Sequence, residues 1–411
     1  MNKNNINVLV NAYACGPNWG SEVGMGWHWV TALANYCQLH VITEYGFKED
    51  IENQLPELDL KFQPKFYYVD VGDTARKLFW QQGSFKFYKF YKTWQQKALM
   101  VANEIVDVQN IDLIHQLNMI GFREPGYLWN IEEKPYVIGP LGGIDNFPSS
   151  FLGYLPIKSR VFTFLKNNYS NYQFKYSKRF KSACEKASVI FAATNDGYKR
   201  LKHIHGQKVQ LLNETGCENK RLAKIAKDFE GTLKILWVGR MEERKALDLA
   251  LESLAAVNDS IDFTLTIVGD GPLESYYKKM IVDKNLTDKC NWKGRILNDE
   301  VQQLMKESDL FLFTSLREGT PHVVTEALQN GLPVICHNAC GHGSVITDAC
   351  GLKIEMINPS HSVSKFSNQI VKIYKDRDLL KKLSFGALKR AEEISWENKA
   401  KDMFETYKSL V

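Results

Sequence analysis

Two carboxylates, Glu318 and Glu326, are separated by seven residues in the stretch SLREGTPHVVTEALQNG. The apolar run just before it (309–313, DLFLF) predicts a buried parallel strand. The helical spacing of the apolar residues that follow predicts a helix with Thr320 as its N-cap and Pro321 at its first position. We therefore expect Glu318 in a strand-to-helix loop and Glu326 inside the helix. Both would face a crevice at the carboxyl end of a sheet.

The charge of these two side chains indicates which ligand they could bind. A helix N-terminus attracts phosphate, but two carboxylates there would repel it. They would instead accept hydrogen bonds from hydroxyl groups, and ionised acceptors make the stronger bonds. A nucleotide-sugar carries both hydroxyls and phosphates, and its phosphates would need cations from elsewhere. The strand expected at 233–238 (LKILWV) is followed by Gly239, Arg240 and, further on, Lys245, which supply them.

This pattern resembles a known family, the retaining GT-B glycosyltransferases often called family 4, or glycosyl transferases group 1. Glu318 and Glu326 resemble its paired-glutamate signature, and Gly239, Arg240 and Lys245 its G-R…K diphosphate motif. Further residues that match the family's pattern are Gly319, Pro321, Gly331, Pro333, Gly294-Arg295 and the turn Gly269-Asp270-Gly271-Pro272. Together these motifs cover roughly the C-terminal half of the chain.

The resemblance implies an α/β protein with the GT-B fold, in which two Rossmann-like, doubly wound domains face a central cleft. Residues 1–217 would form an acceptor-binding domain, 218–395 a nucleotide-sugar-binding domain, and 396–411 a helix that returns to the first domain. The implied enzyme is retaining and metal-independent and needs no cofactor beyond its donor. It would move a sugar from a UDP-, GDP- or dTDP-sugar to a glycan or polyprenyl-linked glycan acceptor in surface polysaccharide biosynthesis.

The resemblance also assigns roles to single residues. Arg240 and Lys245 would hold the diphosphate and offset the charge that develops as the glycosidic bond breaks. Glu326 would bind the ribose hydroxyls, and Glu318 the hydroxyls of the transferred sugar. The other residues expected along the donor are Gly20, Gly239, Gly269, Gly319, Thr320 and Pro321.

The N-terminal strand expected at 6–13 runs into a glycine-bearing loop that includes Gly20. A helix is expected from about Glu22 to Cys37, with Ser21 as its N-cap. In the family this loop closes over the donor phosphates, whereas the alternative is a tight turn that lets the helix pack on the sheet. The loop lacks G-x-G-x-x-G, and only Glu44 could serve as the acidic residue of a dinucleotide site, which disfavours a nicotinamide dehydrogenase.

His115 is a catalytic candidate near the carboxyl end of a strand expected at 111–117. Many relatives carry H-x-H here, but this chain has Leu117 at the second position. The alternative is a core or loop histidine whose hydrogen bonds are satisfied within the protein. The missing second histidine also keeps open an inactive GT-B binding or scaffold protein. Arg123, a little further on, could reach an acceptor phosphate or form a surface ion pair.

Composition fits a two-domain globular protein of 411 residues. A net charge of +5 is too small to indicate nucleic acid binding. We expect a cytoplasmic protein, because no signal-peptide pattern opens the chain and no apolar run approaches the ~20 residues of a membrane span. Packing explains the cluster formed by Cys336, His337, Cys340 and His342 better than a metal does, so no metal site is predicted.

Two segments interleave basic and aromatic residues, at 76–100 and at 158–181. Such a pattern suits a helix that lies on an anionic membrane. It equally suits a surface helix whose aromatic face packs on the core, and we favour this second interpretation for 76–100. The later segment keeps open a peripheral contact with the inner face of the membrane.

Overall fold

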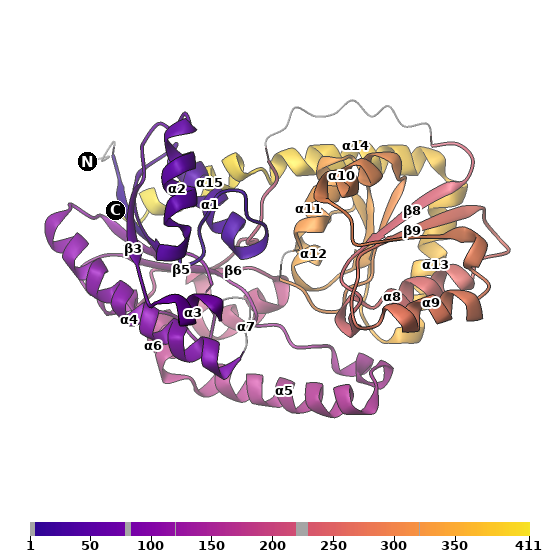
Figure 1. Cartoon of the computed structure of the whole chain (residues 1–411), viewed down its shortest axis with the longest axis horizontal. Helices are drawn as coiled ribbons and strands as arrows, with labels where there is room; N and C mark the ends of the chain where they lie inside the picture. The colour runs from indigo at the N-terminus through magenta and orange to yellow at the C-terminus, as the bar shows by residue number, and fades with distance from the viewer. Residues whose placement is uncertain (1–4, 79–83, 120, 219–228, 320) are drawn as a thin grey trace.

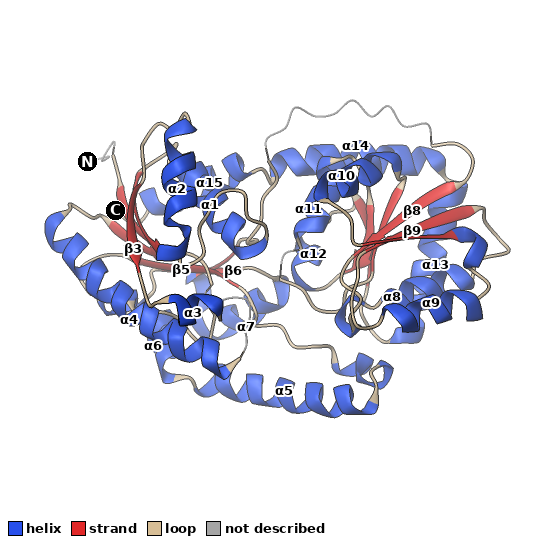
Figure 2. Cartoon of the chain, viewed as in Figure 1, coloured by secondary structure: helices blue, strands red, loops and turns tan. Residues whose placement is uncertain are grey.

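The computed structural model describes residues 5–78, 84–119, 121–218, 229–319 and 321–411. These residues form two parallel sheets, each covered by helices on both faces (Figures 1 and 2). Runs of buried aliphatic residues build the strands, as expected for parallel sheets that are covered on both sides. The predicted GT-B class is thereby confirmed at the level of architecture.

The first sheet has the order β3-β2-β1-β4-β5-β6-β7, and every pair in it is parallel. The chain therefore reverses its direction of travel across the sheet between β1 and β4, and the crevice at such a switch point is where open α/β sheets bind ligands. The strands are β1 (Asn7–Asn11), β2 (Gln38–Glu44), β3 (Lys65–Val69), β4 (Leu113–Gln116), β5 (Tyr136–Leu141), β6 (Val189–Ala192) and β7 (Val209–Leu211).

The second sheet repeats this plan with the order β10-β9-β8-β11-β12-β13, again with parallel pairs. Its switch point lies between β8 and β11, the two strands that precede the predicted cations and the predicted carboxylates. The strands are β8 (Leu233–Val238), β9 (Phe263–Val268), β10 (Cys290–Gly294), β11 (Leu310–Phe313), β12 (Val334–His337) and β13 (Gly351–Ile354).

Helices alternate with the strands along the chain, as expected for two doubly wound units. Those around the first sheet are α1 (Ser21–Leu33), α2 (Lys48–Gln54), α3 (Asp73–Lys77), α4 (Phe85–Val108), α5 (Ile157–Tyr176), α6 (Lys178–Lys186) and α7 (Asn195–His205). Those of the second half are α8 (Leu247–Ala255), α9 (Glu274–Asp283), α10 (Asn298–Glu307), α11 (His322–Gln329), α12 (Cys340–Val345), α13 (Pro359–Lys375), α14 (Arg377–Glu393) and α15 (Trp396–Lys408). Among the helices of the described ranges, none is both long enough and apolar enough to cross a bilayer.

Two predicted helix starts are each displaced by one residue. Helix α1 begins at Ser21, with Gly20 rather than Ser21 at its N-cap, and it ends at Leu33 instead of Cys37. Helix α11 begins at His322, so Pro321 takes the N-cap position, and no side chain caps it. The predicted N-cap, Thr320, lies outside the described residues.

The aromatic stripe of α4 packs on the core, as favoured from the sequence. Phe87, Tyr91, Trp94 and Ala98 are all at most 4% exposed. Trp94 donates its indole N–H to the carbonyl oxygen of Val69. The basic residues of this segment therefore solvate the outer side of an ordinary surface helix.

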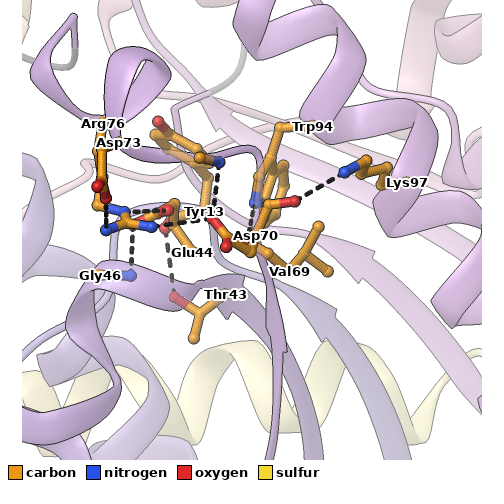
Figure 3. A network of polar contacts seen from close by, with 11 residues as sticks. Tyr13, Thr43, Glu44, Gly46, Val69, Asp70, Asp73, Arg76, Trp94 and Lys97 are labelled. Atoms are coloured by element: carbon orange, nitrogen blue, oxygen red, sulfur yellow. Dashed lines mark hydrogen bonds and ion pairs between the residues drawn. The ribbon is translucent and has the colours of Figure 1, made fainter.

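The ends of β2 and β3 are fixed by an arginine that contacts three carboxylates (Figure 3). Arg76 reaches Glu44 at 3.2 Å, Asp70 at 2.9 Å and Asp73 at 2.6 Å. Glu44 also accepts a hydrogen bond from the backbone N–H of Gly46. These contacts hold the Glu44 carboxylate in place at the end of β2.

The chain crosses between the two halves twice, once near Cys217 and once near Trp396. Backbone hydrogen bonds join the two crossing segments. Cys217 N–H donates to the Ile394 carbonyl at 3.0 Å, and Trp396 N–H donates to the Cys217 carbonyl at 2.9 Å. After this crossing, α15 packs against α1, so the C-terminal segment, yellow in Figure 1, ends on the first domain. Trp396 stacks on His28 there, and its ring also meets Trp29 edge to face.

A second bridge comes from the segment between β5 and α5. The short helix η5 (Ser149–Tyr154) belongs to the first half in sequence, but Phe151 and Leu155 pack on Leu249 and Leu316 of the second half. Tyr154 hydrogen-bonds Glu252. The two domains are thus held at the crossing point and again beside the loops that follow β8 and β11.

The interior of the crossing contains a lysine, Lys399, that is only 6% exposed and lies over the ring of Trp29. Burial lowers the pKa of Lys399 to about 7, against about 10.4 in an unfolded chain. Between these values the unfolded state binds more protons, so Lys399 makes the free energy of unfolding rise with pH. Below pH 7 both states carry the charge, and the cost of burying it is present in full.

We predict that Lys399→Met, which keeps the length of the side chain without its charge, raises the free energy of unfolding at pH 7. The difference from the unmodified protein should shrink between pH 7 and 10, by at most about 1.4 kcal/mol per pH unit. Urea unfolding at pH 7, 8 and 9 measures it. A difference that does not change with pH would show that Lys399 is charged in the folded protein.

Candidate active site

The loops that follow β8 and β11 are joined by hydrogen bonds at the switch point of the second sheet. Leu316 N–H donates to the Arg244 carbonyl at 2.8 Å, and the Thr314 hydroxyl donates to the Lys245 carbonyl at 3.0 Å. Trp237 in turn donates its indole N–H to Thr314 Oγ1 at 3.2 Å. The backbone that carries the predicted cations is therefore fixed against the backbone that carries Glu318.

The side chains that meet across this junction form a compact ion cluster. Glu318 Oε1 contacts Lys245 Nζ, lies 2.5 Å from Arg244 Nη1, and accepts the Ser315 hydroxyl at 3.3 Å. The side chains of Lys245 and Glu318 are each only 12% exposed. Burial lowers the pKa of Lys245, and the adjacent Glu318 carboxylate opposes this shift. The structure thus brings Lys245 and Glu318 into contact at the carboxyl edge of the second sheet.

The glycine turn after β9 packs against the loop after β8. Gly239 N–H donates to the Val268 carbonyl, and Met241 N–H donates to that of Asp270 at 2.7 Å. Gly269 has a positive φ, and a Cβ atom there would overlap the carbonyl oxygen of Gly239. Only glycine allows this approach without displacement, so Gly269 shapes the loop that carries Arg240.

Arg240 and Glu326 are placed differently from Lys245 and Glu318. Arg240 follows β8 at the correct edge of the sheet, but its side chain is exposed and forms no ion pair within the described part of the chain. Glu326 is half-buried on α11, where its charge acts on the nearby Cys217 thiol. It lines neither of the two cavities described below.

Two adjoining cavities lie between the domains and share Arg123, Gly143 and Gly319. The first, here called the cleft cavity, has a volume of about 290 Å³ and opens at the switch point of the first sheet. The second, the cationic cavity, measures about 260 Å³ and includes Glu318. Residues of the cleft cavity that bear on the chemistry are Glu22, Tyr91, Asn118, Glu124, Pro140 and Glu214.

Glu22 is the titratable group in the cleft cavity whose environment is most unusual. It stands in the first turn of α1, and burial raises its pKa to about 7. Gly20, the predicted ligand residue just before it, is exposed and lines neither cavity. Glu214 reaches the same space from the crossing segment, where a Cβ at Gly142 would overlap its carboxylate.

His115 lies in the core of the first domain, away from both cavities. It is fully buried, with Nε2 2.7 Å from the Gly139 carbonyl and Nδ1 2.5 Å from the Tyr407 hydroxyl. A carbonyl can only accept, so Nε2 carries the proton and Nδ1 accepts from Tyr407. Burial lowers the pKa of His115 to about 4. This geometry favours the structural alternative, in which a neutral histidine ties α15 to β4, over a catalytic role.

The cluster after β12 is used for packing. His337 Nε2 meets the Ser362 hydroxyl at 2.9 Å, and the ring of His342 meets Phe313 edge to face. Across the ranges that the structure describes, no three His, Cys, Asp or Glu side chains are grouped so as to hold a metal ion.

Several residues of the site were not identified from the sequence. Arg244 stands next to the motif lysine, and only the fold shows that it shares Glu318. Arg317 precedes the motif glutamate and lines the cationic cavity. Glu22 and Glu214 were hidden because their neighbours in space come from the other domain or from distant loops. For Glu22, the sequence signal that could have identified it was a charged residue among closely spaced glycines.

Comparison with known proteins agrees with this geometry. Residues 219–390 match the family model described as "Glycosyl transferases group 1". The putative teichuronic acid biosynthesis glycosyltransferase TuaC of Bacillus subtilis is 29% identical over 44% of this chain and 46% of its own. It and three other curated glycosyltransferases are matched over less than half of their own length.

Solved structures resemble the whole chain. A glycosyltransferase from Rickettsia africae ESF-5 superposes with a TM-score of 0.63 at 16% identity, covering 99% of both chains. Anabaena Alr3699/HepE, solved in complex with UDP, gives 0.59 at 14% identity and covers 98% of this chain and all of its own. The fold is therefore GT-B, and the match to the glycosyl transferases group 1 model falls in the C-terminal half.

We predict that Tyr407→Phe lowers the free energy of unfolding by about 1–3 kcal/mol, because it leaves the buried Nδ1 of His115 without a donor. Nucleotide-sugar binding should be unchanged, since His115 lines neither cavity. Urea unfolding and a binding titration measure the two effects, with the exposed Tyr276→Phe as control. Lost binding or turnover at unchanged stability would return His115 to the active site.

Proposed function

We propose that this protein is a retaining glycosyltransferase. It moves a sugar from a nucleotide-diphosphate sugar to a glycan or lipid-linked glycan acceptor in surface polysaccharide biosynthesis. The observation that carries the proposal is the contact of Lys245 and Arg244 with Glu318 at the second switch point, where the cleft meets both domains. UDP in the complex of HepE supports a nucleotide donor.

The ion cluster suggests how the donor is received. A diphosphate is a stronger partner for Lys245 and Arg244 than one carboxylate, because it offers more charge and more acceptor oxygens. Its arrival would draw these cations from Glu318, which is then free to accept hydrogen bonds from the hydroxyls of the transferred sugar. The cations remain beside the diphosphate while negative charge develops on it, an electrostatic contribution to bond cleavage.

In this proposal the configuration at the anomeric carbon is retained because the acceptor hydroxyl attacks the face of the sugar from which the diphosphate leaves. This route needs no pair of carboxylates flanking the sugar, unlike that of a two-carboxylate glycosidase. The departing phosphate oxygen would accept the proton of the acceptor hydroxyl. Arg240 and Glu326 complete the donor site by contacting the diphosphate and the ribose, and no metal or other cofactor takes part.

A panel of UDP-, GDP- and dTDP-sugars tests the function directly. Slow hydrolysis of one donor, which needs no acceptor and should persist in EDTA, is the expected result. A donor that raises the melting temperature without any turnover would instead indicate an inactive GT-B binding protein. Protection by NAD alone would overturn the proposal.

We predict that Arg240→Ala and Glu326→Ala each weaken binding of the active nucleotide-sugar at least about tenfold, equivalent to about 1.4 kcal/mol. Both side chains are partly or fully exposed, so the melting temperature without ligand should hold. Calorimetric titration measures affinity, with the exposed neighbours Lys306→Ala and Glu307→Ala on α10 as controls. Unchanged affinity in both variants would remove Arg240 and Glu326 from the donor site.

A further inference from the structure

Besides Arg244, which pairs with Glu318, three cations from three separate elements converge on the cationic cavity. Arg123 comes from the loop after β4, Lys166 from α5, and Arg317 from the loop after β11. Two of them belong to the first domain and one to the second. Their convergence therefore exists only when the two domains face each other.

In the described part of the structure, neutral groups rather than carboxylates hold Arg123. Arg123 donates to the neutral Ser170 hydroxyl at 2.6 Å and to Gln173 Oε1 at 3.1 Å. In the described part of the chain, no carboxylate forms an ion pair with Arg123, Lys166 or Arg317. The cavity also contains Glu318, but Lys245 and Arg244 already hold that carboxylate.

The cations also destabilise one another. Burial, Arg317 and Arg123 all lower the pKa of Lys166. Burial lowers the pKa of Arg317, as do Arg244 and, less strongly, Arg123, while Cys340 and Glu318 oppose the shift. The one further carboxyl group in the cavity, Asp145, has its pKa raised by burial to about 6. A bound anion would relieve this repulsion, whereas an empty cavity leaves it in place.

We propose that Arg123, Lys166 and Arg317 bind a phosphate group on the acceptor. This inference rests on the proposed function and names the chemistry of its acceptor. The phosphate belongs to the acceptor because two of the three cations lie in the first domain, while the donor diphosphate has Lys245 and Arg244. Glu318 also lines the cationic cavity, so an acceptor anchored here would stand beside the transferred sugar.

Phosphate binding to the protein already saturated with its nucleoside diphosphate tests this site. The nucleotide occupies the donor cations, so inorganic phosphate titrated afterwards reports on the cationic cavity. Lys166→Glu and Arg317→Ala should each weaken phosphate binding about tenfold or more. Lys178→Glu, an equal charge reversal at an exposed position of α6, should leave it unchanged. A further titration with a short prenyl diphosphate and with a soluble sugar phosphate distinguishes a lipid-linked from a soluble acceptor.

The outcomes separate the two proposals. If no nucleoside diphosphate binds, the proposed function fails. If one binds but phosphate does not, or binds equally to all variants, the cationic cavity is not an acceptor site. Phosphate that competes with the nucleotide would assign these cations to the donor and equally overturn the inference.

Helix α5 has a second feature that is independent of the cationic cavity. Its apolar side faces solvent. Eight large apolar side chains of this helix are between 53% and 75% exposed. At roughly 3.6 residues per turn they fall on one half of the helix surface. They are Ile157, Val161, Phe162, Phe164, Leu165, Tyr169, Tyr172 and Tyr176.

The other side of α5 is mostly polar and faces the protein. Ser159 donates to Glu243 at 2.9 Å, Asn167 donates to the Phe147 carbonyl at 2.8 Å, and Ser170 accepts from Arg123. Phe174 is the buried apolar exception. This polarity is the reverse of that in an ordinary surface helix, so the exposed face is not a displaced piece of core.

The charge of α5 identifies what could cover this face. The helix contains four basic residues and no Asp or Glu, and Lys158 and Lys175 are exposed beside the apolar side chains. Figure 1 shows α5 along the lower edge of the molecule, where no other described element covers it. Aromatic side chains bordered by lysines suit the interface of an anionic bilayer.

We infer that the exposed face of α5 lies on an anionic lipid bilayer. The same helix presents Lys166 to the cationic cavity, so membrane docking would place that cavity close to the lipid surface. A lipid-linked acceptor phosphate could then reach it without leaving the membrane.

Sedimentation with lipid vesicles tests this contact. The protein should bind vesicles of phosphatidylglycerol and phosphatidylcholine, and bind pure phosphatidylcholine more weakly. The double variant Phe162→Ser and Leu165→Ser should bind at least about tenfold more weakly, because two exposed anchors lose their apolar area. Phe385→Ser removes an equally exposed aromatic group from α14 and should bind as the parent does.

Equal binding by all three proteins, or no binding to anionic vesicles, would overturn the inference. Sedimentation equilibrium of the same variants tests whether a second copy of the chain, instead of lipid, covers this face of α5. A dimer that only the double variant loses would show that α5 covers a second copy of the chain instead of lipid.

Discussion

The hydrogen-bonded junction between the loops after β8 and β11 is the constraint on which the site depends. Two backbone carbonyls, of Arg244 and Lys245, accept from Leu316 and Thr314, so the two loops cannot separate without losing both bonds. Strand pairing between β8 and β11 brings the loops together, and the junction then sets the direction of their side chains. Because Lys245 and Glu318 are nearly buried, their contact would be costly to break unless another charged group replaced one partner.

The first domain makes direct contacts with the residues of this junction. Phe151 and Leu155 pack on Leu316, one of the residues that joins the loops, and Ser159 reaches Glu243 in the loop after β8. The bonded crossing at Cys217 holds the domains at a second place. Two separated contacts restrict rotation of one domain against the other, which is why cations from both domains can converge on one cavity. The shape of the cleft thus follows from the packing of η5 as much as from the two sheets.

The sequence predicted the sheets, and the loops that follow β8 and β11, because the signals for these features are local. Buried strands are apolar runs, and Gly269 reflects a close approach that no side chain allows. Prediction from the sequence failed for residues whose role depends on a partner far away in the chain. Nothing near His115 indicates that Tyr407, almost 300 residues away, occupies its ring nitrogen. Arg244 looks like a neighbour of the motif lysine until the fold brings Glu318 to it. The reversed polarity of α5 is visible only once its protein-facing side is known.

The two sets of cations are electrostatically linked through Arg244 and Glu318. Arg244 lines the cationic cavity and pairs with Glu318, which lies on the same wall. In the proposed reaction a diphosphate takes Lys245 and Arg244, so Glu318 would lose its compensating charges and its negative field would act on the cationic cavity. That field lowers the electrostatic cost of holding Arg317 and Lys166 in their charged forms. The released carboxylate would also repel a phosphate that approached it closely, so an acceptor anion is held on the far side of the cavity. The same ion cluster can therefore keep donor and acceptor phosphates apart while it brings the acceptor hydroxyl toward the sugar.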